Sequence, residues 1–205
     1  LKPDTNSINI SQNYDLIIFG NIWKQWTQYI FLKNSQKIKN ATIVLLDGSD
    51  HPYICWAPGC DHYFKRERYG LSSFFTNYVS FSIPETKLLI DPSVKIKLFS
   101  KHVQCLEAYK LKEVAINCVQ YSCFENETEY FKDLRASKYG ITMKKAGWDY
   151  LRHYEIAFNG AVPAFYRLSL KPPESPPIGL IDMYNCVTFD NALELQEKIS
   201  FIENN

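Results

Sequence analysis

The sequence predicts an α/β protein made of two halves, each with a parallel sheet, of which the N-terminal half is reduced. Short continuous apolar runs, typical of strands buried on both faces, alternate with longer segments of helical periodicity. The first strand, helix and strand occupy residues 14–50, and a βαβ unit of this spacing has a parallel sheet behind it. A second set of strands and helices follows in the C-terminal half.

The N-terminal half is assigned to residues 1–90. Residues 1–13 are polar and rich in Asn and Ser, which indicates a linker or a frayed end. The predicted elements are a strand at 16–20, a helix at 22–33 and a strand at 41–50 that ends in an acidic Asp-Gly turn. The rest of this half contains only a short strand-like piece before Pro84. This half therefore has only two clear strands.

Residues 91–112, rich in Lys, are interpreted as a connector, and residues 113–205 as the C-terminal half. Its predicted elements are a strand at 113–122, a helix at 125–138, a basic turn followed by a helix at 148–159, an apolar strand after Gly160, a strand at 185–190, and a helix at 191–202 capped by Asp190 or Asn191. The segment 171–177, KPPESPP, predicts a loop that neither a helix nor a strand could cross.

The composition is that of a globular protein. Of the 205 residues, 46% are apolar and 22% charged, and the net charge is +1. So small a net charge excludes a global field that would attract nucleic acid or an anionic membrane, and any phosphate site must be local. The sequence has no membrane-spanning run, and its six scattered cysteines suggest free thiols in the cytoplasm. A chain that begins with Leu1 suggests a fragment or a processed product.

The segment 139–165 carries the most informative pattern. In the predicted helix, Arg152 and Glu155 lie one turn apart, and Gly160 ends the helix. Lys144 and Lys145 precede the helix start, where cations and backbone N–H groups together favour an anion. The alternative interpretation is a structural ion pair between Arg152 and Glu155, with both lysines in solvent.

The spacing Arg152-x-x-Glu155-x4-Gly160-x2-Pro163 resembles the nucleotide-sugar-binding segment of exostosin-like and spore-coat-type (CgeB-like) glycosyltransferases. It is also similar to the broader GT-B signature Glu-x4-Gly-x-Pro, with the proline one residue later. The segments YGITMKKAGW, VLLDGSDHP and YFKRERYG look like parts of the same group. The matching stretches cover about a third of the chain.

This resemblance implies a GT-B-like fold of two Rossmann-like halves and a nucleotide-sugar donor site built from Lys144, Lys145, Arg152, Glu155 and Gly160. Glu155 would hold ribose hydroxyls, while Arg152 and Lys145 would offset the charge of the diphosphate leaving group. The acceptor would be a glycan or a surface polysaccharide. No cofactor is expected besides the nucleotide-sugar co-substrate; a divalent metal is compatible with this class but not required. The reduced N-terminal half suggests a missing segment or an oligomer.

Other groups are candidates for chemistry in the N-terminal half. Asp47 and Asp50 lie at the end of the strand at 41–50, where ligands of open α/β sheets bind. One interpretation is a DxD-like metal site for a nucleotide diphosphate, and the favoured one is an Asp-Gly turn with local hydrogen bonds. Asp50 and His51 are the candidate catalytic bases. Cys55-x4-Cys60-x-His62 carries zinc-ligand types without the usual spacing, so no metal site is assigned.

Three further expectations concern the charged cluster, His153 and the function as a whole. Lys65-Arg66-Glu67-Arg68 is expected in a solvated loop, although the resemblance implies a place facing the cleft between the halves. His153 either touches a substrate or packs. The leading functional hypothesis is a glycosyltransferase, and within that class a hexosyltransferase. The alternatives are a non-catalytic domain that keeps the fold to bind a glycan or protein, and a redox or zinc module built on the cysteines.

Overall fold

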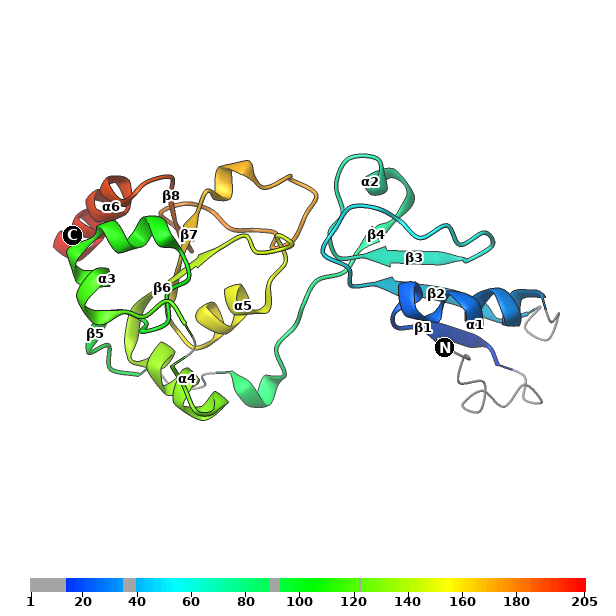
Figure 1. Ribbon diagram of the computed structural model, residues 1–205, viewed down its shortest axis with the longest axis horizontal. Coiled ribbons are helices and arrows are strands. Elements are labelled where there is room, and N and C mark those ends of the chain that lie inside the picture. Colours follow the sequence, from blue (N-terminus) through cyan, green and yellow to red (C-terminus); the bar gives the residue numbers. More distant parts are fainter. Residues whose placement is uncertain (1–13, 35–39, 89–92, 122) are drawn as a thin grey trace. The chain divides into compact units, whose positions relative to one another are not determined.

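The structure is a computed structural model that describes residues 14–34, 40–88, 93–121 and 123–205. It is α/β, with two four-stranded parallel sheets flanked by helices (Figure 1). The described residues before Phe81, together with Pro173–Pro176, form the N-terminal unit, and the others form the C-terminal unit. The predicted fold class of two α/β halves with parallel sheets is therefore confirmed. The predicted linker at 1–13 lies outside the described residues.

The N-terminal unit contains four parallel strands in the order β1-β2-β3-β4. Its elements are β1 (Leu16–Phe19), α1 (Ile22–Asn34), β2 (Thr42–Asp47), β3 (His62–Lys65), α2 (Ser72–Phe75) and β4 (Asn77–Tyr78). The predicted strands and helix of residues 16–50 are confirmed. Helix α1 buries Ile22, Tyr29 and Leu32 against Ile43 and Leu45 of β2. The sequence analysis missed β3 and β4, so this half is less reduced than two strands suggested.

The C-terminal unit has the strand order β5-β6-β7-β8, all parallel (Figure 1). Its elements are the 3-10 turns η2 (Glu85–Lys87), η3 (Leu106–Lys110) and η4 (Leu168–Leu170), the strands β5 (Lys97–Phe99), β6 (Ser137–Met143), β7 (Val162–Tyr166) and β8 (Val187–Phe189), and the helices α3 (Lys112–Asn117), α4 (Glu127–Arg135), α5 (Leu151–Phe158) and α6 (Ala192–Asn204). The segment read as a connector thus contributes β5 and η3.

Helical elements cover both faces of this second sheet. On one face, η3, α3 and α6 pack against Tyr139 and Ile141 of β6. On the other face, Phe131 and Leu134 of α4 form a cluster with Ile156 of α5. Gly140 of β6 faces α5 so closely that an added Cβ would lie 2.6 Å from a side-chain carbon of Ile156. The bare backbone of Gly140 is what lets α5 settle on the sheet.

Two predictions in this unit are wrong. The segment 113–122, predicted as a strand from its β-branched residues, begins as helix α3, which buries Val114 and packs on η3. The segment 137–143, interpreted as the end of a helix and a basic turn, is strand β6. At 113–122, packing on η3 overrode the local strand propensity, whereas the residues Tyr139, Ile141 and Thr142 of β6 favour the strand that forms. The predicted strands at 161–165 and 185–190 and the final helix are confirmed, and Asn191 caps that helix by accepting from Glu194 N at 3.0 Å.

Among the described helices, none has the length and apolar content needed to cross a membrane. The segment 171–177 contains neither helix nor strand, as its prolines predicted.

Candidate functional site

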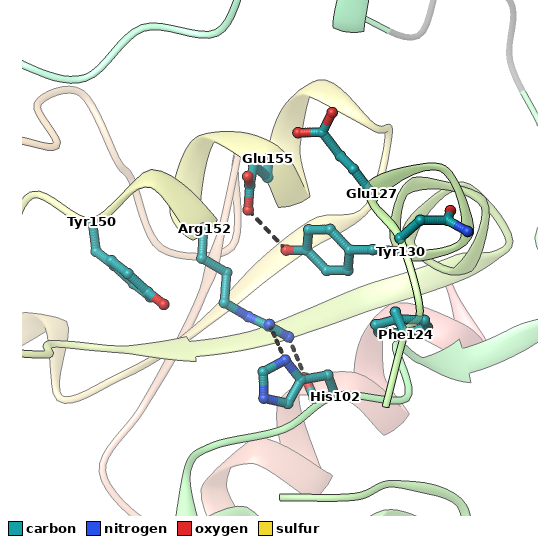
Figure 2. Close-up of a pocket in the computed structure, with 8 residues that line it drawn as sticks. His102, Phe124, Glu127, Tyr130, Tyr150, Arg152 and Glu155 are labelled. Carbon is teal, nitrogen blue, oxygen red and sulfur yellow. Dashed lines mark hydrogen bonds between the residues drawn. The ribbon is translucent and has the colours of Figure 1, made fainter. Parts of the chain in front are cut away.

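A pocket of about 290 Å³ opens in the C-terminal unit (Figure 2). His102 follows β5, and Tyr150 and Arg152 follow β6, so these side chains lie at the carboxyl edge of the parallel sheet, where α/β proteins bind ligands. Helix α4 begins at the same pocket. The lining residues are His102, Phe124, Asn126, Glu127, Tyr130, Tyr150, Arg152 and Glu155.

Arg152 occupies the centre of this pocket (Figure 2). Only 6% of the residue is exposed. Its Nη1 lies 2.8 Å from Nδ1 of His102, and its Nη2 donates to the His102 backbone carbonyl. The guanidinium also lies over the ring of Tyr130, with Cζ 5.6 Å from the ring centroid. Its Nε is buried and finds no hydrogen-bond partner among the described residues, so the donors of this guanidinium are not all used within the protein.

Glu155 lies one helical turn further along α5. Its Oε2 accepts a hydrogen bond from the hydroxyl of Tyr130 at 3.0 Å. Burial raises the pKa of Glu155, while the Tyr130 hydrogen bond and the nearby Arg152 charge act in the opposite direction. Arg152 and Glu155 form no ion pair within 4.0 Å in the described structure. The interpretation of these two residues as a structural ion pair is therefore wrong.

His102 is the buried partner of Arg152. Since a guanidinium can only donate, Nδ1 of His102 accepts, and the ring proton resides on Nε2. Burial and the Arg152 charge lower the pKa of His102. A hydrogen bond with the backbone of Gln120 acts in the opposite direction and raises the pKa, but its effect is smaller. A neutral imidazole is what the contact with Arg152 requires. Sequence reasoning missed His102, because fifty positions separate it from Arg152 and no local pattern links them.

The remaining lining residues are aromatic side chains, a helix-capping asparagine and a carboxylate whose charge is neutralised by a lysine. Phe124 and Tyr130 are in ring contact, with centroids 5.5 Å apart. Glu127, the first residue of α4, forms an ion pair with Lys87 at 2.6 Å, and this pair offsets its charge. Asn126 caps α4 by accepting from Glu129 N at 3.0 Å. The pocket thus joins rings suited to a planar group with one guanidinium and one carboxylate suited to polar groups.

The other predicted donor-site residues have different places. Lys145 is exposed but close to Arg152: with Tyr150 the two line a narrow crevice beside the pocket, and the Lys145 charge also lowers the pKa of His102. The ammonium of Lys144 lies over the ring of Trp148, 5.5 Å from its centroid, and does not line the pocket. Helix α5 begins at Leu151 rather than at 148, so neither lysine immediately precedes it.

Gly160 ends α5, as predicted, and its role is visible in the backbone. Its φ is 75°, the left-handed conformation that favours glycine. The N–H of Gly160 donates to Ala157, and that of Ala161 donates to Ile156, which is a Schellman motif. Gly160 is not among the residues that line the pocket.

His153 packs rather than lining the pocket. Its Nε2 lies 3.0 Å from the carbonyl of Trp148 and its Nδ1 2.8 Å from Oγ1 of Thr142. The carbonyl can only accept, so Nε2 carries the proton and the Thr142 hydroxyl donates to Nδ1. Burial lowers the pKa of His153 to about 4. This neutral histidine fixes the start of α5 to strand β6.

The candidate bases Asp50 and His51 belong to the N-terminal unit. Asp50 forms an ion pair with Arg66. The ring of His51 lies between Trp23, at 5.1 Å, and Tyr53, at 5.4 Å. The nearby Asp47 is fully buried and accepts from Lys65 at 2.9 Å, from the Tyr63 hydroxyl and from Ser49.

The charged cluster 65–68 is not a solvated loop, which corrects that expectation. Lys65 and Glu67 are fully buried, and only 7% of Arg66 is exposed. Burial lowers the pKa of Lys65, and the bond to Asp47 opposes that shift. The Asp47–Lys65 pair joins the ends of β2 and β3, so it serves to hold the N-terminal sheet.

The zinc interpretation gains no geometry. Within the described part of the chain, no three His, Cys, Asp or Glu side chains gather in a way that could hold a metal ion. Cys55 and Cys60 are free thiols, and both pack against the core of the N-terminal unit.

Comparison with known proteins adds no assignment: no protein-family model matches the chain, and no curated protein matches it either.

Proposed function

We propose that the protein is glycosyltransferase-like, binding a nucleotide-sugar donor in the pocket of the C-terminal unit and transferring its sugar to a glycan acceptor. One observation carries this proposal: Arg152 and Glu155 line one pocket without pairing to each other. A guanidinium and a carboxylate held apart in this way complement a ligand that has both an anionic group and hydroxyl donors. The place of the pocket, at the carboxyl edge of a parallel sheet, supports the same class of ligand.

The chemistry of transfer assigns a task to each group. Arg152, with Lys145 beside it, would bind the diphosphate and stabilise the charge that it gains as the bond to the sugar breaks. Glu155 would accept hydrogen bonds from ribose hydroxyls. The aromatic rings of Tyr150 and Phe124 offer faces on which the nucleobase could stack. The acceptor hydroxyl gives its proton to a base as its oxygen bonds to the anomeric carbon. Asp50 and His51 remain the candidates for that base.

Nucleotide binding tests the donor site. We expect UDP-glucose or GDP-mannose at millimolar concentration to raise the melting temperature, because a ligand that binds only the folded state stabilises it. Glu155→Gln removes the carboxylate charge at constant shape and should weaken binding about tenfold or more. Glu203→Gln is the matched control, since Glu203 also accepts from a tyrosine hydroxyl, Tyr139, but lies on α6 outside the pocket. No stabilisation by any nucleotide would refute the donor site.

A second candidate is a binding domain that holds a nucleotide or glycan without transfer. The Asp50–Arg66 pair favours it, because a carboxylate engaged by a guanidinium is a poor base. Release of UDP from UDP-glucose, with and without simple sugar acceptors, separates the two candidates. Binding without release supports the second.

A further inference from the structure

We propose that Tyr130 is a positioning residue that holds Glu155 and Arg152 apart and open to a ligand. The inference rests on the proposed function for its ligand, but its geometry can be tested without one. Tyr130 belongs to α4, outside α5, and it contacts both members of the pair. Figure 2 shows its hydroxyl directed at Glu155 and its ring beside the guanidinium.

The neighbouring residues of α4 fix the direction of Tyr130. Phe131 and Leu134 are buried with Ile156 of α5, so α4 cannot rotate about its axis. Successive residues on a helix point about 100° apart, and Tyr130 therefore leaves the buried face and reaches the pocket. The ring of Phe124 also contacts the Tyr130 ring, with centroids 5.5 Å apart. Burial raises the pKa of Tyr130, so its hydroxyl keeps the proton that it donates.

A carboxylate and a guanidinium three residues apart on a helix ordinarily attract each other. In this pocket each has another partner: the Tyr130 hydroxyl binds Oε2 of Glu155, while His102 and the Tyr130 ring bind Arg152. Oε1 of Glu155 has no hydrogen-bond partner among the described residues and can accept from a ligand. The hydrogen bond from Tyr130 also favours the ionised carboxylate against the effect of burial.

The test uses Tyr130→Phe, which removes the hydroxyl and keeps the ring over Arg152. Carboxyl-carbon NMR of the intact protein, without ligand, follows the titration of Glu155. We expect its midpoint to rise by about half to one pH unit in the variant, since the bond that favours the charged form is lost. Tyr109→Phe is the matched control, because Tyr109 also donates to an acceptor, the carbonyl of Val103, but does not line the pocket. An unchanged midpoint in Tyr130→Phe would overturn the proposal, whereas a fall would support it, because Glu155 freed from the hydroxyl would then pair with Arg152.

A ligand arm adds a second readout. Dissociation constants of UDP-glucose are measured at pH 6 and pH 8 for wild type and Tyr130→Phe. We expect a loss of about threefold to tenfold at pH 6 that shrinks at pH 8, because a higher pH favours the carboxylate form that the hydroxyl otherwise helps to stabilise. An equal loss at both pH values would assign the effect to the position of Glu155 alone, and unchanged affinity at both would contradict the proposal. If wild type binds no nucleotide sugar, the proposed function fails, while the ligand-free titration still decides the role of Tyr130.

Discussion

Arg152 and Glu155 share one face of α5, yet each is held by a residue from another part of the C-terminal unit. His102 accepts from the guanidinium at 2.8 Å, and the Tyr130 hydroxyl donates to the carboxylate at 3.0 Å. The spacing of the motif placed the two residues on one face of the helix. The partners decide what that spacing does, because they direct both groups toward a pocket rather than toward each other.

The contact between His102 and Arg152 predicts a difference between two substitutions. His102→Leu removes the acceptor for Nη1 of a buried guanidinium, and we expect the free energy of unfolding to fall by about 1–3 kcal/mol. His102→Asn offers a carbonyl oxygen close to the position of Nδ1 and should lose less. Urea denaturation at pH 7 measures both values. Equal losses for Leu and Asn would show that the side-chain contact adds nothing.

Gly160 is predicted to matter for stability rather than for binding. Gly160→Ala places a Cβ at a φ of 75°, which costs about 1 kcal/mol in the left-handed region. Thermal unfolding should record that loss, while the dissociation constant for a nucleotide should stay within twofold of wild type. A weakened nucleotide affinity without loss of stability would restore Gly160 to the donor site.

The close approach of β6 and α5 predicts coupling between Gly140 and Ile156. In Gly140→Ala the added methyl would lie less than 3.0 Å from three side-chain carbons of Ile156, so we expect a loss of about 1–3 kcal/mol from overpacking. In Gly140→Ala/Ile156→Ala the new methyl has room. A double-mutant cycle should therefore show that the double variant loses less than the sum of the single ones. Simple additivity would contradict the contact.

His153 predicts acid sensitivity. Its pKa is about 4 in the folded protein and near 6.5 in an unfolded chain, so the unfolded state binds more protons between these values. The stability that the neutral ring contributes is complete above about pH 6.5 and is lost as the pH falls toward 4, by on the order of 3 kcal/mol. Unfolding free energies of wild type and His153→Leu at pH 7 and 4.5 check this. The variant should show a smaller acid loss, and an equal loss in both would exclude His153 as its source.

The sequence predicted what depends on local pattern. The apolar runs that became β1, β2 and β7, and the helix ended by Gly160, follow from periodicity and glycine chemistry. Strand β6 was missed because its residue types depend on contacts with the helices on both faces of the sheet. Tyr139 and Ile141 face one helical layer, and Gly140 faces Ile156 in the other. Only the assembled unit explains a glycine there.

The residues of the candidate site also fall into those that local spacing predicts and those that it does not. Arg152 and Glu155 could be found from their spacing on one helix. His102 and Tyr130 reach the pocket from a loop after β5 and from α4, and no regular spacing connects either of them to the motif. Those contacts come from the order of the strands, which a single sequence does not encode locally.

The parallel pairing of every neighbouring strand has a consequence for how the protein reaches this structure. Leu16 pairs with Thr42, and Lys97 pairs with Ser137, and among the described strands no hairpin joins two neighbours that could pair first. Each pairing must close a long loop before it gains any hydrogen bond. We therefore expect both units to fold slowly for their size, as proteins dominated by distant contacts do. Strand β6 pairs with both β5 and β7, so the sheet of the C-terminal unit cannot assemble until β6 is in place.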